Sequence, residues 1–156
     1  MNKLLNSSLS MLKEKRIPNP ELDLRILLRH AAKTNKDIIL SNFESKDIDI
    51  DYFNSLILKR LNNEPISKII KKKFFWKYEF FVNSNVLDPR PDTELIIEEV
   101  LNNVKNRNKK LKILDIGTGS GCIAISLAKE LKNSEVVAID ISKKALKVAE
   151  KNIKFY

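Results

Sequence analysis

Up to about Asn63, apolar residues recur at the spacing of one helix face. In residues 20–33 these positions are Leu22, Ile26, Leu27 and Ala31. Asn19 precedes Pro20, and this pair is typical of a helix start, with Asn19 as the N-cap and Pro20 in the first turn. The pattern therefore predicts an amphipathic helix that begins at Pro20.

Further helices are predicted on both sides of this one. Residues 49–63 repeat the pattern, with Asp49 or Asp51 as the expected N-cap. Their apolar positions are Phe53, Leu56, Ile57 and Leu61. The first residues of the chain are also amphipathic, and polar residues interrupt their leucines, so they lack the continuous apolar core of a signal peptide. With a shorter helix expected around 36–41, the region predicts a small helical bundle.

The pattern of residue types changes near Pro65. From Ile66 to Val86, β-branched and aromatic residues dominate, which predicts a pair of strands with a turn near Lys77. A new helix is expected to follow. Pro91 stops the preceding segment and Asp92 or Thr93 would cap the helix. Glu94 would lie in its first turn, where a negative charge is favourable.

The last stretch predicts the start of a parallel sheet. Residues 111–117 read LKILDIG, an almost wholly apolar run expected of a strand buried on both faces. A glycine loop, a helix, a second apolar strand at 134–140 and a second helix follow. The predicted fold is therefore α+β passing into α/β. It comprises a helical domain at 1–64, a β-hairpin linker at 65–88, and the first two strands of a Rossmann-like domain at 89–156.

Composition and charge narrow the class of protein. The hydrophobic fraction of 43% suits a packed core, and no apolar run reaches the roughly 18 residues of a membrane span. A single cysteine, Cys122, excludes an internal disulfide and fits a reducing, cytoplasmic compartment. The net charge of +9 favours an anionic partner such as nucleic acid. However, the lysines are scattered and no stacking aromatics interleave with them. We therefore interpret the positive charge as a feature of the overall amino-acid composition rather than as a nucleic-acid-binding surface.

All three glycines of the chain lie in one loop, at Gly117, Gly119 and Gly121. The loop leaves a buried strand and enters a helix, so its amides are expected to face a ligand at the carboxyl edge of the sheet. The next strand ends in Asp140, about twenty residues later, where a carboxylate can accept both hydroxyls of a ribose. Together these features predict a cofactor that contains a nucleoside.

The spacing of the loop separates two kinds of cofactor. It is G-x-G-x-G rather than the G-x-G-x-x-G of dinucleotide folds, and no Walker-type lysine follows it. Asp115 lies just before the first glycine. It either braces the loop or faces the charged amino-acid end of a cationic cofactor, and the sequence leaves both readings open. S-adenosylmethionine tolerates such an acid better than a pyrophosphate would.

These residues resemble those of a known family. The segment ILDIGTGSGCIAISLA is similar to the first motif of class I methyltransferases, and VLDPRPDTELIIEEV resembles the preceding segment of release-factor glutamine-N(5) methyltransferases. EPISKI and FFWKYEFFVN resemble the hairpin of that family. The resemblance implies methyl transfer from S-adenosylmethionine to a glutamine of peptide chain release factors. It also implies a helical domain that faces the substrate.

The resemblance assigns roles to individual residues. It implies that the cofactor is bound by Gly117, Thr118, Gly119, Ser120, Gly121 and Asp140. Ile141 would border the adenine. Arg90, Thr93 and Glu94 would shape the pocket without a defined role.

The chain also departs from the family pattern. Lys68, Lys71 and Lys77 stand where family members usually have a tyrosine or glycines, so a stiffer or differently shaped hairpin is expected. The Asn-Pro-Pro-Tyr motif that orients the glutamine amide does not occur in these 156 residues. We therefore assign no catalytic residue and expect the chain to be inactive alone. The alternatives are a fragment of an adenine-N(6) methyltransferase or a non-catalytic cofactor-binding or interaction fragment.

Other residues with reactive side chains receive structural interpretations. His30 is expected on a helix surface, Cys122 in helix packing, and Trp76 in the core of the hairpin rather than clasping a peptide. No group of cysteine, histidine and carboxylate residues has metal-ligand spacing. The chain is expected to act as a monomer on release factors, without a membrane and without nucleic acid as its direct substrate.

Overall fold

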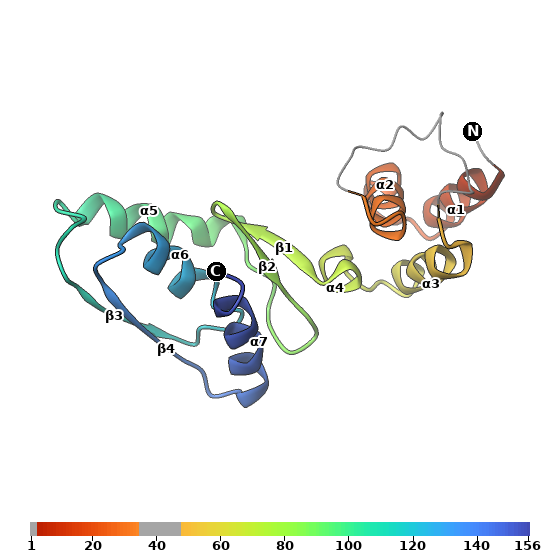
Figure 1. The fold of residues 1–156 in the computed structure, drawn as a ribbon. Helices are drawn as coiled ribbons and strands as arrows, with labels where there is room; N and C mark the ends of the chain where they lie inside the picture. The colour runs from red at the N-terminus through yellow and green to blue at the C-terminus, as the bar shows by residue number, and fades with distance from the viewer. Residues whose placement is uncertain (1–2, 35–47) are drawn as a thin grey trace. The chain divides into compact units, whose positions relative to one another are not determined.

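The computed structural model describes residues 3–34 and 48–156, and these divide into two compact units, Met1–Ile70 and Lys71–Tyr156. Figure 1 shows helices in the described part of the first unit, and both strands and helices in the second. The helix expected around 36–41 lies outside the described residues.

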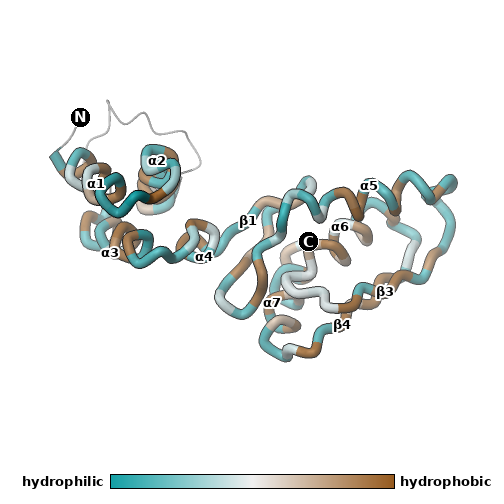
Figure 2. The backbone as a smooth tube through the Cα atoms, turned by 180° about the vertical axis from the view of Figure 1, so that it is seen from behind, coloured by the Kyte–Doolittle hydropathy of each residue, from teal (hydrophilic) through white to brown (hydrophobic). Residues whose placement is uncertain are grey.

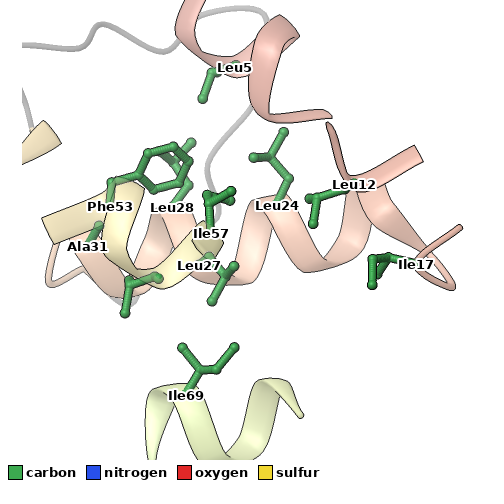
Figure 3. Close-up of a cluster of buried hydrophobic side chains, with 11 residues drawn as sticks. Leu5, Leu12, Ile17, Leu24, Leu27, Leu28, Ala31, Phe53, Ile57 and Ile69 are labelled. Carbon is green, nitrogen blue, oxygen red and sulfur yellow. The ribbon is translucent and has the colours of Figure 1, made fainter. Parts of the chain in front are cut away.

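The first unit is a bundle built from α1 (Lys3–Glu14), α2 (Pro20–Ala31), α3 (Ile50–Leu61) and α4 (Ile66–Ile70). Figure 3 shows side chains of α2 facing those of α3, with Ile69 pointing from α4 toward the same cluster. The core consists of Leu5, Leu12, Ile17, Leu24, Leu27, Leu28, Ala31, Phe53, Leu56, Ile57 and Ile69. The predicted helical bundle is confirmed.

The two predicted caps of α2 and α3 have different outcomes. The side chain of Asp49 accepts a hydrogen bond from the Tyr52 amide at 2.9 Å, which confirms Asp49 as the cap of α3. Asn19 stands at the N-cap position of α2, but its side chain makes no capping bond there. Its φ is 53°, in the left-handed region, whereas side-chain capping needs an extended residue. The prediction that the Asn19 side chain caps α2 was therefore wrong. Asn19 instead forms part of the bend before α2.

The second unit begins with an antiparallel hairpin of β1 (Lys72–Phe75) and β2 (Tyr78–Phe81), closed by the pair Phe75 and Tyr78. The predicted strand pair is thus present but shorter than expected. Residues Ile66–Ile70 form α4 instead of a strand. The carbonyl of Pro65 accepts from the amides of Lys68 and Ile69, and Ile69 is buried in the bundle core. Packing against that core overrides the β propensity of the isoleucines.

After the hairpin, a short 3₁₀ turn at Pro91–Thr93 leads into α5 (Glu94–Asn103). Thr93 stands at the N-cap position, but its side chain makes no capping hydrogen bond, so the predicted capping by this side chain was wrong. The chain continues through β3 (Lys112–Ile116), α6 (Cys122–Glu130), β4 (Glu135–Ile139) and α7 (Lys143–Ile153). Strands β3 and β4 pair in parallel, with Ile113 opposite Val136, which confirms the predicted start of an α/β sheet.

The two faces of this sheet differ in burial. Figure 2 shows hydrophobic stretches along β3 and β4, as the sequence predicts. Ile113 packs against a core that α5 and α6 share with the hairpin. On the opposite face Leu114 is 56% exposed and Ile116 74% exposed, and Val137 and Ile139 are exposed with them. The expectation that β3 is buried on both faces was therefore wrong for this chain, because only one face receives helices from the core cluster.

Candidate cofactor-binding site

The glycine loop joins β3 to α6 and closes over the end of β4. The amides of Gly117 and Thr118 both donate to the carbonyl of Ile139, at 2.8 and 3.0 Å. The amide of Gly121 donates to the carbonyl of Thr118 at 2.8 Å, and Gly121 stands at the N-cap position of α6. The loop is thereby fixed at the carboxyl edge of both strands, where ligands of parallel sheets bind.

The glycines of the loop serve two purposes. All three have positive φ, at 79°, 57° and 81°, which other residues rarely adopt. A Cβ added to Gly117 would meet nothing within 4 Å, so that side of the loop is open. A Cβ on Gly121 would approach Ile125 Cδ1 at 3.2 Å and Ala149 Cβ at 3.3 Å. Gly121 thus allows α6 and α7 to pack closely, while Gly117 leaves room beside the loop.

Asp140 follows β4 and joins the loop to the next helix. Its Oδ2 accepts from the amide of Gly119 at 2.9 Å, and its Oδ1 accepts from the amide of Ser142 at 2.8 Å. These amides, that of Ser142 most strongly, hold the pKa of the Asp140 carboxyl below its usual range. The carboxylate is therefore charged at neutral pH, oriented, and left with a free lone pair on each oxygen for a further donor.

Asp115 has a partner in the loop. The hydroxyl of Thr118 donates to Asp115 Oδ2 at 2.7 Å. This bond favours the loop-bracing role among the two readings that the sequence left open.

The structure brings the predicted site residues together, but they differ in how far they are exposed. Gly117 is exposed, and Gly119 and Asp140 are partly exposed at the same edge of the sheet. Thr118 and Ser120 are buried, at 5% and 2% exposure. A ligand on the open side of the loop would meet backbone groups of these two residues rather than their hydroxyls. Ile141, expected beside an adenine, is fully exposed.

Glu94 has a defined contact that the sequence does not indicate. Its Oε1 accepts from the backbone amide of Trp76 at 2.9 Å. Trp76 is the first of the two residues that connect β1 to β2, and its φ is 56°. Turns of this kind usually have glycine there, so Glu94 holds a strained turn in place. Arg90 is exposed before the 3₁₀ turn.

Glu130 of α6 contacts both residues of the same turn. It accepts from the indole nitrogen of Trp76 at 2.9 Å and from Lys77 Nζ at 2.6 Å. The Lys77 ammonium first and the Trp76 indole second lower the pKa of the Glu130 carboxyl. The sequence signal for such anchors was the Trp-Lys turn itself, which lacks glycine and needs outside support.

His30, Cys122 and Trp76 were predicted to have structural rather than catalytic roles. His30 is partly exposed on α2, with its Nε2 3.1 Å from the hydroxyl of Tyr52. Cys122 is buried, and this burial raises the pKa of its thiol, which disfavours a nucleophilic thiolate. Trp76 packs against the core cluster of the second unit. Within residues 3–34 and 48–156, no group of metal-ligating side chains occurs and no helix is long and apolar enough to span a membrane.

Comparisons with known proteins agree with these features. Residues 3–70 match the family described as the PrmC N-terminal domain, and residues 107–155 match a methyltransferase domain family. The release factor glutamine methyltransferase of Leptospira interrogans is 41% identical over 151 residues, covering 96% of this chain and 53% of that protein. The protein of that name from Buchnera aphidicola is 42% identical over 139 residues, covering 87% of this chain and 50% of that protein.

A bifunctional methyltransferase of Rickettsia typhi is 43% identical over 173 residues, which cover 97% of this chain and 33% of that protein. The chain thus spans about half the length of the first two relatives and a third of this one. The two family matches and these relatives point to the same kind of protein, and together they cover most of the sequence. Over most of its length the chain is therefore similar to the N-terminal part of release factor glutamine methyltransferases.

Proposed function

We propose that this chain binds S-adenosylmethionine at loop 117–121 and Asp140, as part of an enzyme that methylates a glutamine of peptide chain release factors. The observation that carries the proposal is the bond between the Gly119 amide and Asp140 Oδ2, at 2.9 Å. It joins the glycine loop to the acid after β4 in a single site at the carboxyl edge of the sheet. This arrangement suits a nucleoside cofactor.

The residues present fit this cofactor in shape and in charge. The open space beside Gly117 leaves room for a ligand against the backbone, and Asp140 retains lone pairs for ribose hydroxyls. Asp115 and Asp140 place negative charge at the loop, which suits a sulfonium and an ammonium better than a pyrophosphate. These two acidic residues thus favour S-adenosylmethionine over a dinucleotide as the cofactor.

When bound, S-adenosylmethionine supplies a methyl group activated by a positively charged sulfur. The residues of this chain would hold it: Asp140 on the ribose, and the backbone of 117–121 beside the amino-acid end. The glutamine amide is a poor nucleophile because its lone pair is delocalised, so transfer depends on orienting that amide. We assign none of the described residues to this orienting role.

The helical domain at 1–64 is the proposed surface for the release factor. Its support is the match of residues 3–70 to the PrmC N-terminal domain, together with relatives named as release factor glutamine methyltransferases. The corresponding cofactor domain is 89–156. Release factors act in translation, so we propose that the chain functions in the cytoplasm. We also propose that it acts as a monomer.

A set of direct titrations tests the cofactor. The purified chain is titrated by calorimetry with S-adenosylmethionine, S-adenosylhomocysteine and NAD. We expect the first two to bind with one site and NAD to give no heat. Binding of NAD alone would refute the assignment.

Cross-linking to an unmethylated release factor tests the proposed partner surface. We expect cross-links from residues 3–34 or 48–64, and cross-links confined to 89–156 would contradict the proposal.

A further inference from the structure

The outer edge of β2 is covered by side chains from the C-terminal end of the chain. The hydroxyl of Tyr156 accepts from the Glu79 amide and donates to the Glu79 carbonyl, both at 2.8 Å. The side-chain amide of Asn152 makes the equivalent pair with Phe81, accepting from its amide at 2.8 Å and donating to its carbonyl at 3.0 Å. Two side chains thus satisfy backbone groups that a third strand would otherwise occupy.

Asn152 also contacts the glycine loop. Its Nδ2 donates a further hydrogen bond to the carbonyl of Ser120 at 2.8 Å. Both donors of the amide are thereby used, one on the hairpin and one on the loop. Asn152 is only 2% exposed, so water does not compete for these bonds. One buried side chain therefore joins β2 to the loop that is proposed to hold the cofactor.

A second residue on the same face of α7 contacts the loop. Ala149 lies one turn before Asn152 and packs so closely on Gly121 that an added Cβ there would approach it at 3.3 Å. Helix α7 therefore contacts two successive loop residues, Ser120 by a hydrogen bond and Gly121 by close packing. Figure 1 shows α7 running beside both β2 and α6.

We propose that Asn152 is a positioning residue for the cofactor loop: it fixes the Ser120–Gly121 peptide relative to β2 and so keeps the open side of the loop ready for the cofactor. The inference rests on the proposed function and extends it to a residue outside the site. It predicts that hairpin and loop are coupled through one amide. Disrupting that amide should weaken cofactor binding although Asn152 lies on the buried side of the loop.

The choice of side chain is specific. In Asn152→Asp a carboxylate oxygen would replace the donor and face the carbonyls of both Phe81 and Ser120. Asn152→Ala would leave the same carbonyls buried without a donor. Tyr156→Phe is the matched control, because it removes the hydroxyl that makes the other two hydrogen bonds on the β2 edge and makes no change at the loop.

The experiment measures the dissociation constant for S-adenosylhomocysteine and the thermal midpoint of the 156-residue chain and its three variants. We expect both Asn152 variants to bind at least fivefold more weakly at a temperature where each is folded. Tyr156→Phe should lower the midpoint but keep the affinity within twofold. Equal loss of affinity in Tyr156→Phe and Asn152→Ala would overturn the positioning role. If Asn152→Asp does not fold, Asn152→Ala decides.

A second measurement does not depend on the cofactor. Amide hydrogen exchange of Gly119 and Gly121 reports the loop directly, since both amides are hydrogen-bonded. We expect faster exchange at both in Asn152→Ala than in Tyr156→Phe. If the unchanged chain does not bind S-adenosylhomocysteine, the proposed function fails, and the exchange rates still decide the role of Asn152. Equal exchange in the two variants would then refute it.

Discussion

The two units of the chain are held together in different ways. The helical unit has a core of leucine, isoleucine and phenylalanine side chains drawn from all four described helices. The α/β unit also has apolar clusters, but its hairpin, glycine loop and last helix are joined by side chains bonded to backbone groups. Packing of the first kind follows a periodic pattern, whereas bonds of the second kind depend on single residues. The second unit is therefore the one in which one polar substitution can alter the site.

The largest expected effect tests the apolar core of the helical unit. Phe53 is fully buried in α3, so Phe53→Ala should destabilise that unit by about 3–5 kcal/mol. Hydrogen exchange should rise across α1 to α3 and stay unchanged at 111–121. Leu58→Ala, at an exposed position of the same helix, should change stability by less than about 0.5 kcal/mol. Equal exchange changes in both units would show that they do not behave as separate cores.

A smaller effect is expected for the polar anchor of the hairpin. Glu130→Gln removes the charged partner of Lys77 and should destabilise the α/β unit by about 1 kcal/mol, a low value because Lys77 is exposed. Urea unfolding monitored by Trp76, the single tryptophan, measures the change. A stability equal to that of the unchanged chain would show that Glu94 alone holds the turn.

The same anchor predicts a dependence on pH. Because folding lowers the pKa of Glu130, the folded state binds fewer protons, and the stabilisation is present above the ordinary glutamate pKa of about 4.3. It is lost as pH falls through the lower pKa of the folded state. Trp76 emission should therefore change below about pH 4.3 in the unchanged chain. In Glu130→Gln this transition should be absent, and its persistence would assign it to another group.

The smallest predicted effect concerns a strained backbone. Lys71 has a φ of 57°, where a residue with a Cβ is disfavoured, so Lys71→Gly should stabilise the chain by about 0.5 kcal/mol. Lys73→Gly is the matched control in β1, where glycine should instead cost about 0.5–1 kcal/mol. Thermal midpoints that shift in the same direction for both would contradict the strain at Lys71.

The sequence predicted those features that repeat along the chain or concentrate in one place. Helix α3 follows from periodic apolar residues and the Asp49 cap, and the site loop follows from three glycines between a strand and a helix. Local patterns misplaced Ile66–Ile70, because its packing partners lie on other helices. They also missed Asn152, which resembles any asparagine near a helix end until its partners on Phe81 and Ser120 are known.

The most direct test of the cofactor site is the affinity of Asp140→Ala for S-adenosylhomocysteine, measured by calorimetry. We expect a loss of about 1.5–3 kcal/mol, because ribose hydroxyls would lose a charged acceptor. Asp140→Asn should be milder, and Glu150→Ala, which removes an exposed acid from α7, should bind as the unchanged chain does. Because the pKa of Asp140 is lowered, the affinity should hold until the pH falls below the ordinary aspartate value of about 3.9. Unchanged affinity in Asp140→Ala would remove Asp140 from the site and contradict the proposed function.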